Sequence, residues 1–342
     1  MRVTTKDRYL RTLSGEPVEP LPFAPITMMF AADLVAAQYR DYATDHRVLV
    51  RGQTEVAERF DASVVSAISD PCVEASDLGC ECDFPENAPP AVREEKARLV
   101  EKSELTSLRP VPPEDGPRMS NRIRAVGGLR KAVGDDLMVE GWVEGPCAEA
   151  ADLRGLNRLM LDFYDDPSFV GDLMDLATEQ AIRFAEAQIG VGADIVGIGD
   201  AASSLIGGAL YRTFVLPRTA RIVDAIHTAG AAVRLHICGT IIDLLGSIAS
   251  LPVDQLDVDS MNDMATVRRS VGVALCGNLD PVRVVRDGDP QLIRRALANC
   301  RRASGVPYIV GAGCEIPRGT PPEHLSAMAE FAADPGAGAS SE

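Results

Sequence analysis

The sequence predicts an α/β fold, a (β/α)₈ TIM barrel that forms one domain over residues 1–333 and ends in a flexible tail, residues 334–342. Three observations predict it. Helical patterns separate most of the apolar runs, and no glycine-rich dinucleotide fingerprint follows any run, which disfavours an open doubly wound sheet. The third is the set of eight runs, each five to seven residues long: 21–27, 62–68, 137–143, 193–199, 232–238, 253–258, 273–277 and 307–311.

Each run is mostly apolar on both faces, as a parallel strand is when helices cover one side and the barrel interior the other. The helical patterns end at residues that stop helices, for example Gly230 and Gly305. They cover residues 45–59, 165–189, 212–229, 240–250 and 290–303.

Residues 77–108 interrupt the alternation after the second run. Three prolines, Pro85, Pro89 and Pro90, precede a charged helical pattern near residues 94–102. We therefore expect an insertion that covers the barrel top or forms an edge hairpin.

Composition restricts the function. Apolar residues make up 46% of the 342 residues, so a large core is possible. Lysine and arginine number 34 against 50 aspartate and glutamate residues, a net charge of −16, which argues against nucleic-acid and anionic-membrane partners.

The sequence has no run of 18 apolar residues, and its first residues lack the apolar core of a secretory signal. We therefore expect a cytoplasmic protein without a membrane partner. In that compartment the eight cysteines are expected to be thiols or metal ligands rather than disulfides.

Active sites of this architecture lie where the strands end. His236 and Cys238 end the fifth run, and side chains two apart on a strand point the same way. Cys314 follows the last run. One imidazole and two thiolates would give Zn²⁺ three protein ligands and leave the fourth position open, which is the catalytic arrangement.

Ordinary structural roles are open for all of these residues. A lone His-x-Cys pair is weak evidence for a metal, because buried free cysteines are common core residues. Cys80 and Cys82 fall in the irregular insertion, where two loop thiols are expected. His227 precedes Gly230 at a helix end. The carboxylates at strand ends, which include Glu144, fit general bases, substrate ligands or helix N-caps, and for Asp200 and Asp280 an N-cap and a site role fit equally well.

Taken together, the strand-end motifs resemble the uroporphyrinogen decarboxylase superfamily, and within it the zinc-dependent methylcobamide:coenzyme M methyltransferases. The order and spacing of the short motifs carry the resemblance over nearly the whole chain. The motifs are Ser69-Asp70-Pro71, Glu144-Gly145-Pro146, Gly192-Ala193-Asp194, Leu235-His236-Ile237-Cys238-Gly239, Gly277-Asn278-Leu279-Asp280-Pro281 and Gly313-Cys314-Glu315-Ile316-Pro317.

The resemblance implies a zinc ion on His236, Cys238 and Cys314. The arginine-rich segment with which the decarboxylases grip their substrate has no counterpart, because residues 26–30 contain no arginine. The resemblance further implies that a methyl group passes from a methylcorrinoid, which a separate protein carries, to a thiol, and that this transfer leaves Co(I).

The resemblance also suggests roles for residues at the barrel mouth. Glu144, Asp200, Asn278 and Asp280 are expected to orient the substrate or support the metal, and Met28 and Met29 to form part of the rim that meets the corrinoid. Glu315 is either a fourth ligand or solvated.

Three alternatives are open. The chain could demethylate an ether or amine onto the corrinoid protein, act as a metal-free decarboxylase-like lyase, or be a barrel whose thiols only pack. The sequence does not define the small-molecule donor or acceptor or the oligomeric state.

Overall fold

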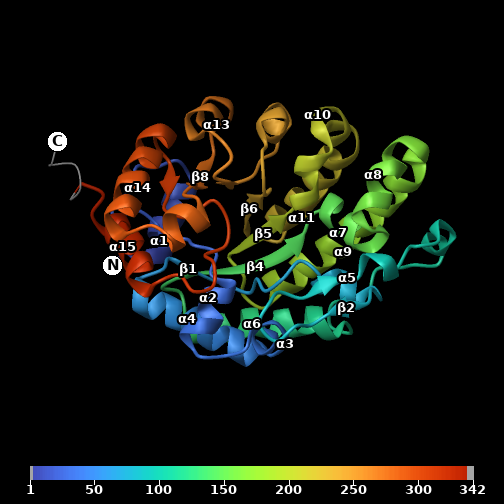
Figure 1. Cartoon of the computed structure of the whole chain (residues 1–342), viewed down its shortest axis with the longest axis horizontal. Helices are drawn as coiled ribbons and strands as arrows, with labels where there is room; N and C mark the ends of the chain where they lie inside the picture. The colour runs from blue at the N-terminus through green and yellow to red at the C-terminus, as the bar shows by residue number, and fades with distance from the viewer. Residues whose placement is uncertain (1–2, 337–342) are drawn as a thin grey trace.

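In the computed structural model of the protein, which describes residues 3–336, a curved parallel sheet forms the centre of the molecule (Figure 1). The part of the predicted tail beyond residue 336 lies outside the described residues. The seven strands pair in the order β1-β4-β5-β6-β7-β8-β9. They are β1 (Val64–Ser66), β4 (Met138–Glu144), β5 (Ile195–Gly199), β6 (Ala232–His236), β7 (Gln255–Val258), β8 (Ala274–Gly277) and β9 (Tyr308–Ile309).

Residues 21–27, predicted as the first strand, form no regular strand, but they lie between the two edges of the sheet. The Ala24 N–H donates to the Val310 carbonyl at 2.9 Å, and the Ser63 N–H donates to the Phe23 carbonyl at 2.7 Å. This extended segment therefore occupies the eighth place of the barrel and joins the ends of the seven-stranded sheet.

Prolines explain why the segment is not a strand. Pro20, Pro22 and Pro25 lack an N–H, so they cannot donate to a continuous ladder. Only the bridge between Phe23 and Val310 satisfies strand pairing there. The fold is a single-domain α/β barrel of the TIM type, as predicted, with one strand replaced by a proline-rich segment.

Helices cover the outside of the sheet (Figure 1). The patterns predicted at 45–59, 165–189, 212–229 and 290–303 are confirmed as α4, α9, α11 and α14. The pattern at 240–250 yields only a 3₁₀ turn (Ile242–Leu244) and α12 (Leu245–Ile248). The outer helices are α4 (His46–Phe60), α6 (Pro117–Val133), α9 (Pro167–Gly190), α11 (Leu216–Thr228), α13 (Met264–Ser270), α14 (Pro290–Ser304) and α15 (Pro322–Ala333).

Shorter helices lie at the two ends of the barrel. The first helix, α1, is at the end where the strands begin, because its Lys6 N–H bonds to the Asp136 carbonyl just before β4. The short helices are α1 (Thr5–Leu13), α2 (Met28–Leu34), α3 (Tyr39–Thr44), α5 (Val73–Asp77), α7 (Pro146–Arg154), α8 (Leu156–Asp165) and α10 (Gly207–Leu210).

The barrel interior is more polar than the apolar runs predicted. Arg234, 2% exposed, points inward from β6 between Glu140 of β4 and Asp257 of β7. Below this layer the Tyr9 hydroxyl of α1 donates to Gln255 at 2.7 Å and closes the floor. Period-2 alternation places Arg234 on the same strand face as His236.

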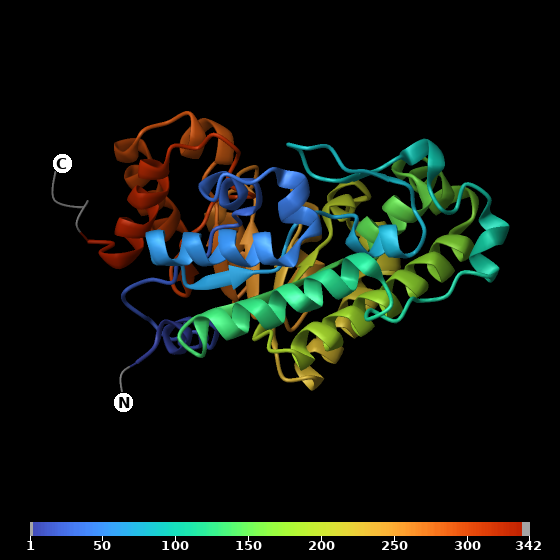
Figure 2. The same ribbon diagram turned by 90° about the horizontal axis from the view of Figure 1, so that it is seen from below.

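The insertion forms a small hairpin of β2 (Cys82–Asp83) and β3 (Ala91–Val92), separate from the main sheet. It lies on the same side of the molecule as α2, where the strands end (Figure 2). Arg40 of α3 and Arg318 of the loop after β9 both donate to hairpin carbonyls.

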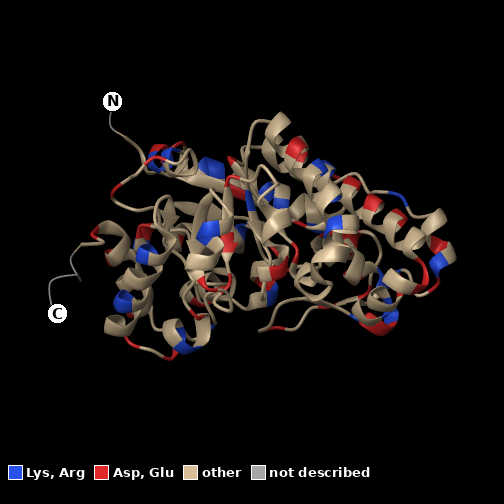
Figure 3. Ribbon diagram, turned by 90° about the horizontal axis from the view of Figure 1, so that it is seen from above, with Lys and Arg blue, Asp and Glu red and all other residues tan. Residues whose placement is uncertain are grey.

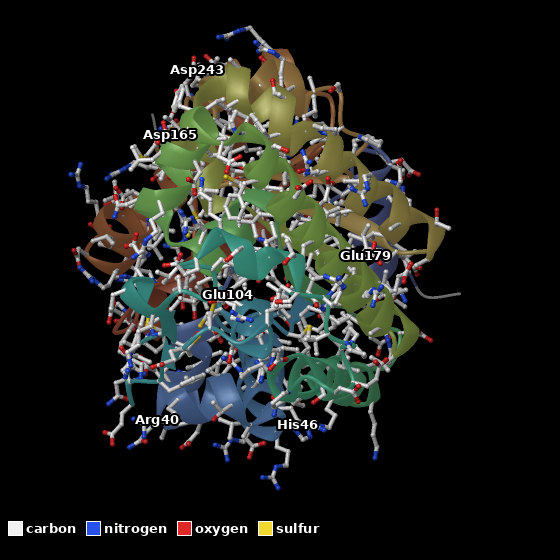
Figure 4. All side chains as sticks on the ribbon, turned by 90° about the vertical axis from the view of Figure 1, so that its right-hand side faces the viewer. Arg40, His46, Glu104, Asp165, Glu179 and Asp243 are labelled. Carbon is white, nitrogen blue, oxygen red and sulfur yellow. The ribbon has the colours of Figure 1, made fainter. Side chains whose placement is uncertain are left out.

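The charged helix predicted at 94–102 is wrong. Only a 3₁₀ turn (Glu94–Lys96) forms, because Leu99 is buried and its N–H bonds to the Leu153 carbonyl at 2.8 Å instead of to a helical partner. Farther along, Glu104 lies between the N-terminal helices and the green helices α8 and α9 (Figure 4).

Candidate metal centre

Three side chains from two distant segments converge where the strands end. His236 is the last residue of β6, Cys238 follows two residues later, and Cys314 lies in the loop after β9. The His236 Nε2 is 3.0 Å from the Cys238 Sγ and 3.7 Å from the Cys314 Sγ, and the two sulfurs are 3.8 Å apart. The structure therefore brings together the three residues that the sequence grouped, and we call them the triad.

The triad fits a tetrahedral zinc ion. Zinc–sulfur bonds of about 2.3 Å and zinc–nitrogen bonds of about 2.0 Å at tetrahedral angles separate two sulfurs by about 3.8 Å and a sulfur from a nitrogen by about 3.5 Å. The sulfur–sulfur separation of 3.8 Å agrees with this geometry, and the two nitrogen–sulfur separations, 3.0 and 3.7 Å, lie within about 0.5 Å of it. The donor set of one imidazole and two thiols is one that zinc prefers.

A close backbone approach places Cys314. A Cβ atom added to the preceding Gly313 would lie 2.4 Å from the Ser260 nitrogen, so only glycine lets this loop approach the end of β7. The Gly313 N–H also donates to the Leu279 carbonyl at 2.8 Å, which ties the loop to the segment after β8.

A buried carboxylate orients the imidazole. His236 and Asp257 are register partners on β6 and β7, and the His236 Nδ1 lies 3.1 Å from the Asp257 carboxylate. Asp257 also accepts two bonds from the Arg234 Nε and one from Gln255. Burial raises the pKa of Asp257, but the Arg234 charge and the His236 contact outweigh it and hold the pKa below its ordinary value. The ionised carboxylate leaves Nε2 free to face the two sulfurs.

The two thiols of the triad differ in acidity. The hydrogen bond with Cys238 lowers the pKa of Cys314 to about 4, despite burial and with help from His236. The same bond raises the pKa of Cys238. One thiolate is therefore present at neutral pH, which is the protonation state a metal ligand needs.

Two cavities adjoin the triad. A smaller one of about 200 Å³ is lined by all three triad residues, and a larger one of about 500 Å³ is lined by Cys238. Glu144, the last residue of β4, lines both. The triad therefore lies at the wall of a space that is large enough for a small molecule.

Trp142 of β4 shapes the smaller cavity. Its ring lies beside the His236 ring with centroids 6.2 Å apart, and its Nε1 donates to Glu144 at 3.3 Å. The ring fits because β5 carries glycines: a Cβ at Gly197 would lie 2.1 Å from the ring. Burial, followed by the charge of Glu74, raises the pKa of Glu144 well above its ordinary value.

The other predicted carboxylates make structural hydrogen bonds. Asp200 is buried beside the triad, but its two oxygens accept from the Ala148 N–H of α7 at 2.7 Å and from the Ser203 hydroxyl at 2.8 Å. Asp280 accepts from the N–H groups of Val282 and Arg283, so of its two open roles the structure shows the N-cap.

Asn278 bonds to the neighbouring loop rather than facing the triad. Its amide nitrogen donates to the Asp259 and Asn262 carbonyls, which joins the loops after β7 and β8. Neither Asn278 nor Asp280 belongs to the lining of the two cavities.

Met28 and Met29 begin α2 at the rim. Met28 lines the smaller cavity and packs near Trp142, whereas the Met29 N–H donates to the Glu315 carboxylate at 2.6 Å. Burial raises the pKa of Glu315 to about 7. Glu315 therefore stabilises the start of α2, and it is not part of the ligand group that the triad forms.

Sequence reasoning missed the supporting residues Trp142, Arg234 and Glu140. The available signal was the alternation along β6, because Arg234, His236 and Cys238 are spaced by two and share one face. A buried arginine on the inner face of a strand requires carboxylate partners on its neighbours.

The sequence profile of the uroporphyrinogen decarboxylase (URO-D) family matches residues 4–334, so the barrel with its rim cavity is that of a known enzyme family. The chain belongs to the uroporphyrinogen decarboxylase family. Its relatives include both methyltransferases and decarboxylases.

Among the methyltransferases, the chain is 29% identical over 340 residues to the methylcobamide:CoM methyltransferase MtbA of Methanosarcina mazei, with 96% of this chain and 97% of that protein covered. It is 25% identical over 337 residues to MtaA of Methanosarcina barkeri, covering 95% and 96%. The uroporphyrinogen decarboxylase of Chromohalobacter salexigens is 28% identical over 353 residues, covering 95% and 96%.

A solved structure described as a methyltransferase from Methanosarcina mazei superposes with a TM-score of 0.89 at 24% identity, covering 98% of this chain and 99% of that one. The fold is therefore shared over the full barrel. Its relatives that are named as methyltransferases show that the protein is an enzyme that transfers methyl groups. In the described part of the chain, no helix combines the length and apolar character needed to cross a bilayer.

Proposed function

We propose that the protein transfers a methyl group between a methylcorrinoid, carried by a separate protein, and a small thiol that zinc activates at the triad. The convergence of the His236 nitrogen and the Cys238 and Cys314 sulfurs is the observation that carries this proposal. The relatives named for methylcobamide substrates support the corrinoid.

The residues divide into ligands and supports. His236, Cys238 and Cys314 would hold the ion, and Asp257 fixes the imidazole ring in the orientation that aims Nε2 at it. When bound with an open fourth position, zinc supplies a Lewis acid that lowers the pKa of a substrate thiol.

The thiol proton needs an acceptor when the sulfur attacks. Glu144 lines both cavities, and its carboxyl lies near the triad at the end of β4. We assign Glu144 the role of binding the thiol beside the ligands and holding its proton through a hydrogen bond. Its raised pKa makes the Glu144 carboxylate a stronger base than an ordinary glutamate, which suits it to accept that proton.

The methyl carrier would dock where the strands end. Five exposed apolar side chains lie on segments that follow successive strands around this end: Leu156, Leu205, Ile242, Met261 and Val282. Exposed apolar side chains around a cavity are typical of a protein interaction site. Met28 would contact the corrinoid from the rim, since it lines the smaller cavity.

The chain is acidic overall, with a net charge of −16, but positions of both signs are distributed over the described elements. Acidic and basic positions alternate along the described helices (Figure 3). Docking of a carrier would therefore depend on the apolar rim and its shape more than on a single charged face.

In this proposal, three of the residues have structural roles and no direct role in methyl transfer: Asp200, Asn278 and Asp280. Asp200 holds the start of α7 next to Glu144, and Asn278 and Asp280 hold the loop that follows β8. Each keeps a segment of the rim in place, so we expect smaller effects on transfer from their loss than from loss of a ligand.

Metal analysis combined with a transfer assay tests the proposal. The purified protein should hold one zinc ion and convert methylcobalamin plus a small thiol into the methyl thioether and Co(I), which is followed by its absorption spectrum. Protein that carries zinc but methylates no thiol would refute the direction proposed here. Protein that binds no zinc would refute the centre itself.

A further inference from the structure

The larger cavity beside Cys238 has an unbalanced charge. Its ionisable lining residues besides Cys238 are Glu94, Glu144 and Asp152, and among the described residues that line it there is no lysine or arginine. The rest of the wall is largely apolar, with alanines from α7 and from the turn after β5 and the side chains of Leu156 and Leu205.

The smaller cavity has the same bias. Asp70, Asp200 and Glu315 line it along with Glu144, again without a lysine or arginine among its described lining residues. Arginines near these acids are already bonded. Arg118 pairs with Asp70 at 2.6 Å. Arg158 lies beside Gly155 of the larger cavity and donates to the neutral backbone carbonyl of Glu94 at 3.0 Å, so it stays charged but is not among the lining residues.

An unpartnered carboxyl oxygen faces this space. Glu144 is only 6% exposed, and its Oε1 accepts from Trp142 at 3.3 Å, but no donor from the described residues reaches Oε2. Because the Glu144 side chain lines both cavities, a molecule bound there can supply the donor that Oε2 lacks.

Two further buried carboxyl groups, those of Glu149 and Glu74, lie close to Glu144. Glu149 of α7 is 1% exposed, and neither of its oxygens has a hydrogen-bond partner among the described residues. Glu74 accepts from the Glu144 N–H at 2.9 Å. Burial and mutual repulsion raise the pKa of Glu149 and Glu74 as well as that of Glu144, as expected for carboxyls packed together without a cation.

We infer that the larger cavity selects a thiol with a positively charged tail, such as an aminoalkyl thiol, over a thiol with an anionic tail. The unpartnered Glu144 oxygen, together with Glu94 and Asp152, would receive the ammonium group, and the apolar wall would contact the short carbon chain. The inference rests on the proposed function, and it concerns only which thiol is used.

The acidic lining of this cavity disfavours coenzyme M, the thiol that appears in the names of the relatives. Coenzyme M carries a sulfonate, and a sulfonate in this cavity would meet carboxyl groups and no lysine or arginine from the described lining residues. Reversing the charge of a ligand group that lies several ångströms from a carboxylate changes the affinity of the ligand by about tenfold or more at the effective dielectric constant of such sites.

Three thiols of equal length test the inference. The zinc-loaded protein is given methylcobalamin and 2-aminoethanethiol, 2-mercaptoethanol or 2-mercaptoethanesulfonate at pH 7 and constant ionic strength. We expect kcat/KM to fall in that order, by about tenfold for each step. Binding of the same thiols is measured by calorimetry, so that selectivity is read independently of transfer.

Matched variants separate charge in the cavity from general effects. Asp152→Lys places a cation in the cavity wall and should invert the order of the ammonium and sulfonate thiols. Asp224→Lys makes the same change on the exposed face of α11 and should leave the order unaltered.

The outcomes separate this inference from the proposed function. Methyl transfer that prefers the sulfonate thiol, or tighter binding of that thiol, would overturn the inference and leave the function standing. Transfer to none of the three thiols would count against the function, and the calorimetric order would still decide the charge preference.

Discussion

Two groups of cysteines lie at the end of the barrel where the strands terminate, and only one of them forms a ligand group. Cys238 and Cys314 meet His236 within hydrogen-bonding distances, although Cys314 is 76 residues from Cys238 along the chain. Cys80 and Cys82 are also two residues apart, like His236 and Cys238. Their thiols instead donate to backbone carbonyls, the Cys80 thiol to Asp152 at 3.6 Å and the Cys82 thiol to Cys80 at 3.8 Å.

The difference comes from what stands behind each pair. His236 ends a strand that is paired on both sides, and Asp257 and Arg234 fix its ring from within the barrel. Cys82 begins a two-residue strand at the edge of a hairpin, and Cys80 precedes it. A spacing of two brings ligands together only when a regular strand and a buried hydrogen-bond network hold both residues.

The largest expected effect is loss of the metal when a triad residue is changed. Cys238→Ser replaces a thiolate with a hydroxyl that does not ionise at neutral pH, so zinc affinity should fall by more than about a hundredfold. Cys82→Ser on the hairpin is the matched control and should keep one zinc ion per chain.

Zinc content after dialysis against a weak chelator measures the difference, and circular dichroism verifies that both variants are folded. If both variants lose the ion equally, the contrast between the two groups is mistaken. The same holds if neither loses it.

The next effect concerns the residue behind the imidazole. Asp257→Asn keeps the shape of the side chain but removes the charge that orients His236, so zinc affinity should fall about 10- to 100-fold. Asp254→Asn is the control, because Asp254 bonds to the exposed His227 and to a backbone N–H, away from the triad. Competition with a fluorescent zinc chelator gives both affinities, and equal values for the two variants would remove Asp257 from the metal centre.

The alternation of apolar runs and helices was sufficient to predict the barrel. In a barrel, strands far apart in sequence end on the same rim, and this rule by itself predicts that Cys314 lies near His236. The same rule located Glu144 at the cavity. These predictions depend on strand order and direction, which the sequence pattern reports directly.

Features that depend on tertiary contacts were not predictable. Nothing local in residues 94–102 shows that Leu99 will bond to Leu153 and pull the chain out of a helix. Position at a strand end also did not distinguish Glu144, which has one oxygen without a donor among the described residues, from Asp200, which lines the smaller cavity as well but uses both oxygens to hold α7 and its neighbouring turn. That difference depends on which N–H groups a neighbouring element presents.

Asp152 lies where the two regions meet, so its titration reports on the contact between them. It lines the larger cavity, and its carbonyl accepts the Cys80 thiol. Burial, with a smaller contribution from Asp70, raises the pKa of Asp152 to about 7 from an ordinary value of 3.8. The folded state therefore binds this proton more tightly than the unfolded state does, and the stabilisation is lost as the pH rises from about 4 to about 7.

Asp152→Asn removes the ionisable carboxyl, so the variant does not lose this stabilisation as the pH rises. The free energy of unfolding of the variant relative to the unaltered protein should increase by about 2–3 kcal/mol between pH 5 and pH 8. Urea unfolding at the two pH values measures this change. Asp224→Asn, on the exposed face of α11, should show no such change, and a flat difference for Asp152→Asn would place its carboxyl in water rather than in the cavity wall.

The smallest effect tests whether position at a strand end is enough to make a residue part of the centre. Asp280 follows β8, but its carboxylate accepts from Val282 and Arg283 and lines neither cavity. Asp280→Ala should therefore lower the free energy of unfolding by about 1 kcal/mol, as loss of an N-cap does, and leave zinc content unchanged. Asp280→Asn retains an N-cap oxygen and should restore the stability. Loss of zinc in either variant would mean that the rim after β8 supports the triad directly, and the contrast between the two cysteine groups would then depend on loops as much as on strands.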